Sequence, residues 1–521
     1  MAMALIRLHR RPAIALAAIA TAALMAGSVT AQPQISAVEH VFDIADAAVT
    51  QAPCGTDSMP ESGLQGDVSA ADRASGRSAR GYSCNITKIG GYAGRGGGIT
   101  SATFEHCVYI GSFFPGNLLG PAQGVQVLDV SDPANPILTD TLTAPAMLAG
   151  TWESLKVNIT RKLLIGAGVP ALTGSGLLAV YDLTDCAHPR LLNPGPGTDS
   201  AQPLPITAHE GGFSPDGNTY WSSGVVGGLV SAVDLADPTR PRVVWQGTPG
   251  KAMHGLGVSE DGNRLYLADN DGGLTILDSS AVQRREPNPQ APILSRLTWS
   301  DGWATQHNIP VTYKGRRYLF TVDEAGSGGV KVIDIADDTN PAIVNTIKLA
   351  INVPENQDSG LASSMGGSVF GYDAHYCTAD RPADPTALAC GWVSSGIRVF
   401  DVRDPMNVRE VAYYNPPART GRNSELWNSP HALASIIGLP ILQAPAVIQA
   451  LDADVFDPAQ ALGPRSGMIG LGDLSSDWCL SAPNWHGNQL WATCADNTFM
   501  TLQLDPAVYT PPADQLSTSG S

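Results

Sequence analysis

The chain has 521 residues, a formal charge of −17 from 48 acidic and 31 basic side chains, and a hydrophobic content of 43%. This composition excludes a disordered chain, and the scarcity of basic residues disfavours binding to nucleic acid or to an anionic membrane. With 55 Gly, 39 Pro and only 15% charged residues, the sequence favours a turn-rich, mostly β protein over one with long solvated helices.

Residues 1–31 are predicted to be a secretory signal peptide. Three arginines (Arg7, Arg10 and Arg11) precede an apolar stretch over 13–26, and Val29-Thr30-Ala31 supplies the small residues of a cleavage site. The Arg10-Arg11 pair fits either twin-arginine export or an ordinary basic start. The apolar stretch is too short to span a membrane. We therefore expect a periplasmic or secreted protein without a membrane span.

Residues 32–80 are predicted to form an N-terminal arm. All eight cysteines follow the signal peptide, and an even number in an oxidising compartment indicates disulfides. Two pairs have the spacing of facing hairpin strands, Cys377 with Cys390 and Cys479 with Cys494. The other four cysteines can pair in three ways, of which we favour Cys54 with Cys84 and Cys107 with Cys186.

A repeat follows the arm. Six segments share an apolar strand that ends in Asp, and most continue into a Pro-containing turn, as in Gly124-Val-Gln-Val-Leu-Asp129-Val-Ser-Asp-Pro133. The shared aspartates are Asp129, Asp182, Asp234, Asp278, Asp334 and Asp401. Most segments are preceded by a strand pair with a turn such as Ser214-Pro-Asp-Gly217. Four short strands in a period of about 45 residues are typical of a β-propeller blade.

These segments resemble LVIVD repeats, which build propellers in exported bacterial proteins. The resemblance covers residues 100–410 and implies the fold but no activity, because propellers host many functions. A seventh blade is predicted over 478–504, with the strand at 84–92 as its outer strand, so that the ring is closed. We therefore predict an all-β fold, a seven-bladed propeller over 81–506 with insertions at 353–374 and 417–476 and a flexible tail at 507–521.

Four histidines begin predicted inner strands in the same register. His209, His254 and His307 each lie eight residues before the turn glycine of their blade, and His375 starts its strand in the same phase. In the second blade this register falls on Glu153. In the seventh blade it falls on Asp477 or Cys479, and we favour Asp477 because Cys479 is predicted to form a disulfide.

Inner strands of a propeller converge on its axis, so equivalent positions form a ring around it. Imidazoles supported by carboxylates are typical ligands of iron, copper and zinc. The sequence therefore predicts a metal centre with the ligands His209, His254, His307 and His375, and with Glu153 and Asp477 either as further ligands or as hydrogen-bond partners of the imidazoles. Because no thiolate is present, iron or copper is favoured over zinc, which remains an option. The alternative is a set of polar side chains that line a wet channel.

This layout is similar to that of the carotenoid-cleaving oxygenases and of the selenium-binding protein family, which includes methanethiol oxidase. The similarity implies a metal-dependent oxidoreductase acting on a small organic substrate. Glu153 and His431 are the catalytic candidates, His431 as a lid residue, or alternatively as a loop residue without a role. His486, in a predicted turn, is expected on the surface. Alternative functions are a metal-dependent lyase or hydrolase, and a non-catalytic propeller for adhesion or protein interaction.

Overall fold

The computed structural model describes residues 38–39, 47–113, 124–168, 176–194, 203–204, 206–225, 227–326, 329–356, 371–419, 426–432 and 476–512. The predicted signal peptide and most of both predicted insertions lie outside these residues. Among the described residues, no helix combines the length and the apolar character that crossing a bilayer requires.

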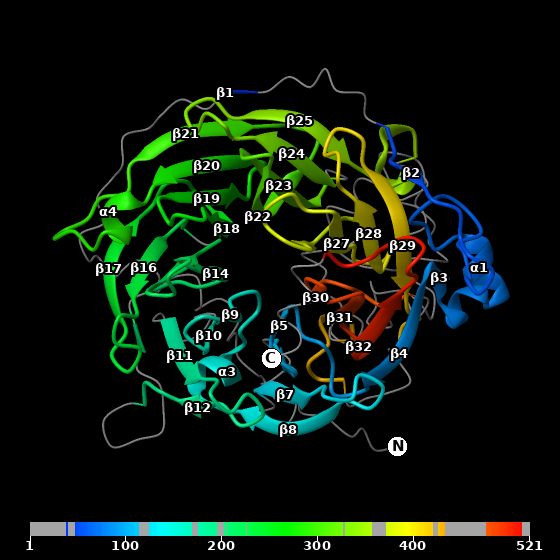
Figure 1. Ribbon diagram of the computed structural model, residues 1–521, viewed down its shortest axis with the longest axis horizontal. Helices are drawn as coiled ribbons and strands as arrows, with labels where there is room; N and C mark the ends of the chain where they lie inside the picture. Colours follow the sequence, from blue (N-terminus) through cyan, green and yellow to red (C-terminus); the bar gives the residue numbers. More distant parts are fainter. Residues whose placement is uncertain are drawn as a thin grey trace, which may run out of the picture.

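Seven antiparallel sheets stand around a central axis (Figure 1), which confirms the predicted seven-bladed propeller. The first two blades are β5–β8 (Ser101–Phe104, Cys107–Ile110, Val125–Asp129, Ile137–Leu142) and β9–β12 (Lys156–Asn158, Leu163–Gly168, Gly176–Asp182, Arg190–Leu191). The third and fourth are β14–β17 (Glu210–Phe213, Thr219–Ser223, Val230–Asp234, Arg242–Gly247) and β18–β21 (Met253–Val258, Arg264–Asp269, Gly273–Asp278, Ile293–Thr298). The fifth and sixth are β22–β25 (Trp303–Tyr313, Arg316–Ala325, Val330–Asp334, Ala342–Ile347) and β26–β29 (Tyr376–Ala379, Ala387–Gly391, Ile397–Asp401, Arg409–Asn415).

The seventh blade joins the two ends of the propeller. It consists of β30 (Asn484–His486), β31 (Gln489–Cys494), β32 (Thr498–Leu504) and the N-terminal strand β4 (Ile86–Tyr92). β4 pairs antiparallel with β32, with Ile86 opposite Leu504 and Tyr92 opposite Phe499. The predicted closure by an N-terminal strand is therefore confirmed.

Short elements complete the described structure. The helical segments are α1 (Ala70–Ser75), α3 (Pro145–Ala149), α4 (Ser280–Gln283) and the 3-10 turns η1 (Arg77–Arg80), η2 (Ala350–Asn352) and η3 (Pro354–Asn356). The remaining strands are β1 (Val38–Glu39), β2 (Thr50–Gln51), β3 (Tyr82–Cys84) and β13 (Pro203–Leu204). β1 pairs with the outer strand of the fourth blade, whereas β2 and β3 pair with the outer strand of the sixth. The N-terminal segment thus covers the outer edges of two blades before it closes the ring.

The repeated Asp has a structural role. In the first blade, Val125, Val127 and Leu128 are buried, because the third strand packs against neighbouring blades on both faces. The Asp129 carboxylate that ends this strand accepts a hydrogen bond from the backbone N–H of Ser131 at 2.8 Å. Asp182 caps its turn in the same way at 2.9 Å. Part of the acidic composition is therefore turn architecture.

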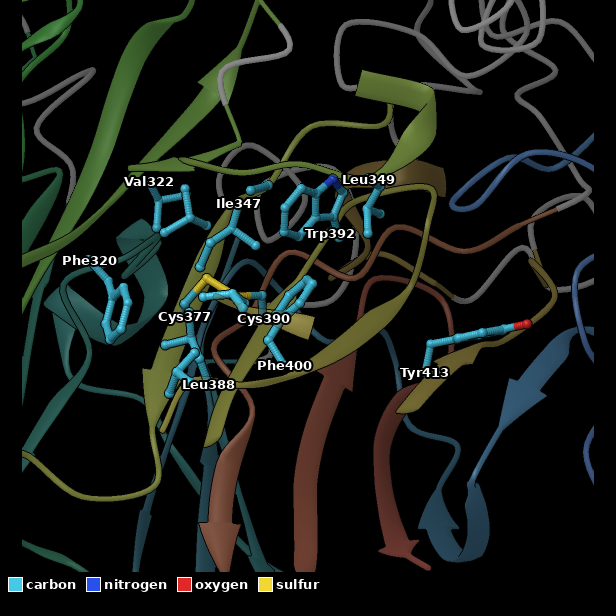
Figure 2. Packing of buried hydrophobic residues seen from close by; sticks show 14 of the residues in the cluster. Phe320, Val322, Ile347, Leu349, Cys377, Leu388, Cys390, Trp392, Phe400 and Tyr413 are labelled. Atoms are coloured by element: carbon cyan, nitrogen blue, oxygen red, sulfur yellow. A yellow bond between two sulfur atoms is a disulfide. The ribbon is translucent and has the colours of Figure 1, made fainter. Parts of the chain in front are cut away.

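All four predicted disulfides are present: Cys54–Cys84, Cys107–Cys186, Cys377–Cys390 and Cys479–Cys494. Four disulfides are typical of a protein in an oxidising compartment. Figure 2 shows the bridge between Cys377 and Cys390 within the buried cluster, close to Phe400 and Trp392. It joins facing residues of β26 and β27, and Cys377 lies two residues after His375.

The Cys107–Cys186 disulfide is expected to be important for stability. It links the first blade to the second and closes a loop over a sequence separation of 79 residues. Replacing both cysteines with serine should lower the free energy of unfolding by about 2–5 kcal/mol, because the unfolded chain gains conformational entropy. Urea unfolding of the oxidised variant and the wild type measures this loss, and an unchanged midpoint would contradict it.

His486 is half-buried rather than on the surface as predicted. Its ring stacks on Trp491 with a centroid distance of 3.5 Å, because residues 484–486 form strand β30 instead of a turn. Burial lowers the pKa of His486 to about 4, from a usual value of 6.5.

This shift in the pKa of His486 predicts acid sensitivity. Between pH 6.5 and pH 4 the unfolded chain binds a proton at His486 that the folded protein does not bind, so stability falls as the pH falls through this range. The contribution is about 1–3 kcal/mol and is complete below pH 4. His486→Phe keeps an aromatic ring against Trp491 without the titration. Its unfolding free energy should therefore rise relative to wild type between pH 7.5 and pH 4, and a constant difference would contradict this assignment.

Candidate functional site

Three of the predicted histidines meet one predicted carboxylate near the inner strands. Glu153 lies just before β9, His209 and His375 immediately precede β14 and β26, and His254 is the second residue of β18. Backbone hydrogen bonds fix two of these positions. The N–H of Glu153 donates to the carbonyl of His209 at 3.3 Å, and the N–H of His209 donates to the carbonyl of Ser223 at 2.8 Å. The centre formed by Glu153, His209, His254 and His375 therefore draws on four blades.

Glu153 bridges the three imidazoles. Its Oε2 lies 3.6 Å from His209 Nε2 and 3.5 Å from His254 Nε2, and its Oε1 lies 3.4 Å from His375 Nε2. The Nε2 atoms of His209 and His254 are 2.8 Å apart. Two ligand atoms that share a metal at about 2.1 Å lie roughly 3.0–3.4 Å apart in tetrahedral or octahedral geometry. The distances between the nitrogen and oxygen atoms that converge at the centre are close to this range. These residues therefore fit a first-row transition metal.

Backbone packing beside His254 requires a glycine. A Cβ at Gly255 would lie 1.7 Å from Glu210 Oε2 and 2.1 Å from the carbonyl oxygen of Gln306. The absence of a side chain therefore lets β18 approach β22 at the level of the centre.

Glu324 is a site residue that the sequence analysis missed. Its Oε2 lies 3.0 Å from His375 Nε2, and its Oε1 lies 3.7 Å from His254 Nδ1. Glu324 belongs to β23, the second strand of its blade, whereas the histidine register was read only from inner strands. The acidic pair Asp323-Glu324 near the end of that strand was the available signal.

His307 lies beside the centre instead of in it. The pairing of β22 with β23 shifts register between Thr305 and His307. As a result Gln306 reaches the centre, where its Nε2 donates to Glu153 Oε2 at 3.0 Å. The His307 Nδ1 lies 2.8 Å from Glu210 Oε1, which is also 3.5 Å from Lys156 Nζ. A β-bulge, which exchanges neighbouring side chains between faces, explains this placement.

Asp477 and His431 lie in a separate buried cluster with Asp496. Asp477 Oδ1 accepts backbone hydrogen bonds from Trp478 at 2.7 Å and Asp496 at 2.8 Å, and its Oδ2 accepts one from Asn497 at 2.8 Å. His431 Nδ1 is 3.3 Å from Asp496 Oδ2 and 4.0 Å from Asp477 Oδ1. The Asp477 carboxylate is thus engaged by loop amides, which explains why it does not extend the ring of histidines. The roles predicted for both residues stay predictions.

The pKa values at the centre reflect burial and mutual charge. Burial alone would raise the pKa of Glu153, but the positive potential of His209 and His254 outweighs burial and holds the pKa well below its usual value. Burial lowers the pKa of His254. For His375, the Glu324 and Glu153 carboxylates outweigh burial and raise the pKa. An ionised carboxylate among imidazoles is an arrangement that attracts a cation.

The tautomer of His375 is set by its outer hydrogen bond. Its Nδ1 lies 2.8 Å from the carbonyl oxygen of Leu480, an acceptor, so Nδ1 carries the hydrogen and Nε2 faces Glu153 and Glu324. This outer hydrogen bond to a backbone carbonyl is the usual support of a metal-binding histidine.

Solvent reaches the centre at His209 and Glu324, and this part of it is here called the open side. The side chains of His209 and Glu324 are 18% and 15% exposed, whereas Glu153, His254 and His375 are buried. The buried Nδ1 of His254 has no hydrogen-bond partner among the described residues, since Glu324 lies too far away for one. The buried side chains can therefore hold an ion, and a small molecule would reach this ion from the side of His209 and Glu324.

Comparisons with known proteins concern the fold. No curated protein matches the chain. Among solved structures, it is similar to a functionally unknown protein from Desulfotomaculum acetoxidans (12% identity, 61% of this chain, 84% of that chain, TM-score 0.42). It is also similar to the periplasmic gluconolactonase of Pseudomonas aeruginosa (15% identity, 58% and 80%, TM-score 0.42) and to a protein from Lactobacillus plantarum (15% identity, 59% and 82%, TM-score 0.43). Residues 122–143 and 249–295 match the LVIVD repeat, so this chain carries that repeat in the first and fourth blades of its propeller.

Proposed function

We propose that the protein is an exported metal-dependent enzyme whose ion is held by His209, His254, His375 and Glu153. The observation that carries the proposal is the convergence of three imidazole Nε2 atoms from three blades on the two oxygens of one buried carboxylate. Three imidazoles with carboxylate and without thiolate suit iron or copper, and zinc as a third choice.

The proposed chemistry is oxidation of a small organic substrate. A bound transition metal with an open position supplies redox chemistry or Lewis acidity at this point. Glu153 and His254 are buried, so they lie on the side of the centre away from solvent. Glu324, partly exposed, lies on the open side within 3.0 Å of His375 Nε2. Its carboxylate is thus placed to accept a proton from a molecule that approaches from this side.

A dioxygen-dependence experiment tests the proposed reaction class. Protein isolated from the periplasm with its native metal is incubated with a panel of small phenols, alcohols, thiols, lactones and esters, in air and under argon. An oxidase or oxygenase should consume dioxygen and form product only in air, and Glu153→Gln should abolish this turnover. Equal product under argon, or ester and lactone hydrolysis without dioxygen uptake, would overturn the oxidoreductase proposal.

A further inference from the structure

Trp152 and Phe113 form an aromatic surface beside His209, here called the aromatic wall. Trp152 directly precedes Glu153, and its ring lies 5.3 Å from the His209 imidazole and 5.4 Å from the Phe113 ring, measured between centroids. Behind these rings lies an apolar cluster that includes Val393 and Leu480. The partly exposed His209 therefore faces charged and metal-binding groups on one side and aromatic carbon on the other.

The conformation of Trp152 is costly in two ways. Its φ of +44° is rare for a bulky residue and costs about 1–3 kcal/mol. Its indole Nε1 is buried without a hydrogen-bond partner among the described residues, which costs about 1–3 kcal/mol more. The backbone N–H of Trp152 donates to the carbonyl of Ser112 at 3.2 Å, which helps to hold this conformation. Such costs are concentrated at functional sites, where they position a side chain for a ligand.

The chemistry of this border identifies a class of substrate. Flat rings pack well against indole and phenyl faces, with about 0.5–1.5 kcal/mol per aromatic pair beyond the buried area. The carboxylates of Glu153, Glu210 and Glu324 disfavour an anionic substrate. Resting on the proposed function, we propose that the substrate is a small neutral phenol, with its ring against Trp152 and its hydroxyl directed to the centre.

Binding of phenol itself tests this inference. Calorimetric titration compares phenol, cyclohexanol and benzoate on protein whose metal content has been measured. Phenol should bind at least about fivefold more tightly than cyclohexanol, as one aromatic contact provides about 1 kcal/mol, and more tightly than benzoate, whose charge the carboxylates repel. Trp152→Leu should remove the preference over cyclohexanol, and Trp152→Phe, which keeps a ring, should retain part of it. Trp485→Leu is the matched control, because its ring packs against Tyr509 at 4.8 Å.

The outcomes separate this inference from the proposed function. Equal binding of phenol and cyclohexanol overturns the phenol assignment, and so does an unchanged preference in both Trp152 variants. If the protein holds a stoichiometric metal, neither result contradicts the proposed metal centre. A phenol preference that depends on Trp152 in protein that binds no metal supports the aromatic wall and overturns the metal enzyme. If Trp152→Leu does not fold, a reduced preference in Trp152→Phe supports the inference and an undiminished one contradicts it.

Discussion

Removal of metal by a chelator is expected to lower the Tm of the wild-type protein and to leave the Tm of His254→Ala unchanged. An ion that binds only the folded state stabilises it by about 4 kcal/mol when its concentration is a thousand times its Kd. His254 contributes one of three converging nitrogens and is buried against Glu153, so its loss should lower affinity sharply. Calorimetric scans with and without chelator measure the two shifts.

His307→Ala is the matched control for this experiment. His307 belongs to an inner strand, as His254 does, but its Nδ1 pairs with Glu210. Its chelator-dependent shift in Tm should therefore equal that of the wild type. Glu153→Gln keeps the size of the side chain and should behave like His254→Ala. A chelator shift that persists in both His254→Ala and Glu153→Gln would contradict the assignment of this centre.

Arg398→Met is expected to lower the free energy of unfolding by about 3–5 kcal/mol, because it leaves two buried carboxylates without their cation. Arg398 is fully buried in β28, where its guanidinium pairs with Glu61 of the N-terminal segment and with Glu410 of β29 at 3.0 Å. It also lies over the Tyr413 ring at 4.5 Å. The substitution should therefore release the N-terminal segment from the sixth blade as well as destabilise the fold.

Urea unfolding of Arg398→Met measures this loss, and limited proteolysis reports on the N-terminal segment. Arg403→Met is the control, since Arg403 is exposed and pairs with Asp401 on the surface at 2.8 Å, a contact of about 0–1 kcal/mol. Similar losses in the two variants would show that the buried charges of Glu61 and Glu410 do not need Arg398.

The fold could be predicted because its signals are local and repeated. Apolar strands that end in residues such as Asp129 and Asp234 recur in six blades, and each carboxylate caps its own turn. The closing strand β4 could be predicted because the last blade lacked an outer strand within its own sequence. The disulfide pairing followed from hairpin spacing for four of the cysteines.

The candidate site could be predicted only in part, since it depends on details of strand register. His209, His254 and His375 meet Glu153 as the inner-strand alignment indicates. A one-residue bulge in β22 brings Gln306 to the centre in place of His307, and no feature of the sequence marks that bulge. Glu324 reaches the centre from a second strand, a placement that depends on how neighbouring blades pack.

The most direct test of the metal centre is elemental analysis of protein purified from the periplasm without added metal. About one iron or copper ion per chain is expected in the wild type and in His307→Ala. Less than about a tenth of that is expected in Glu153→Gln and His254→Ala, because loss of a ligand or of its support weakens binding strongly. Wild-type protein without a stoichiometric transition metal, or equal metal in all four proteins, would contradict the proposed metal centre.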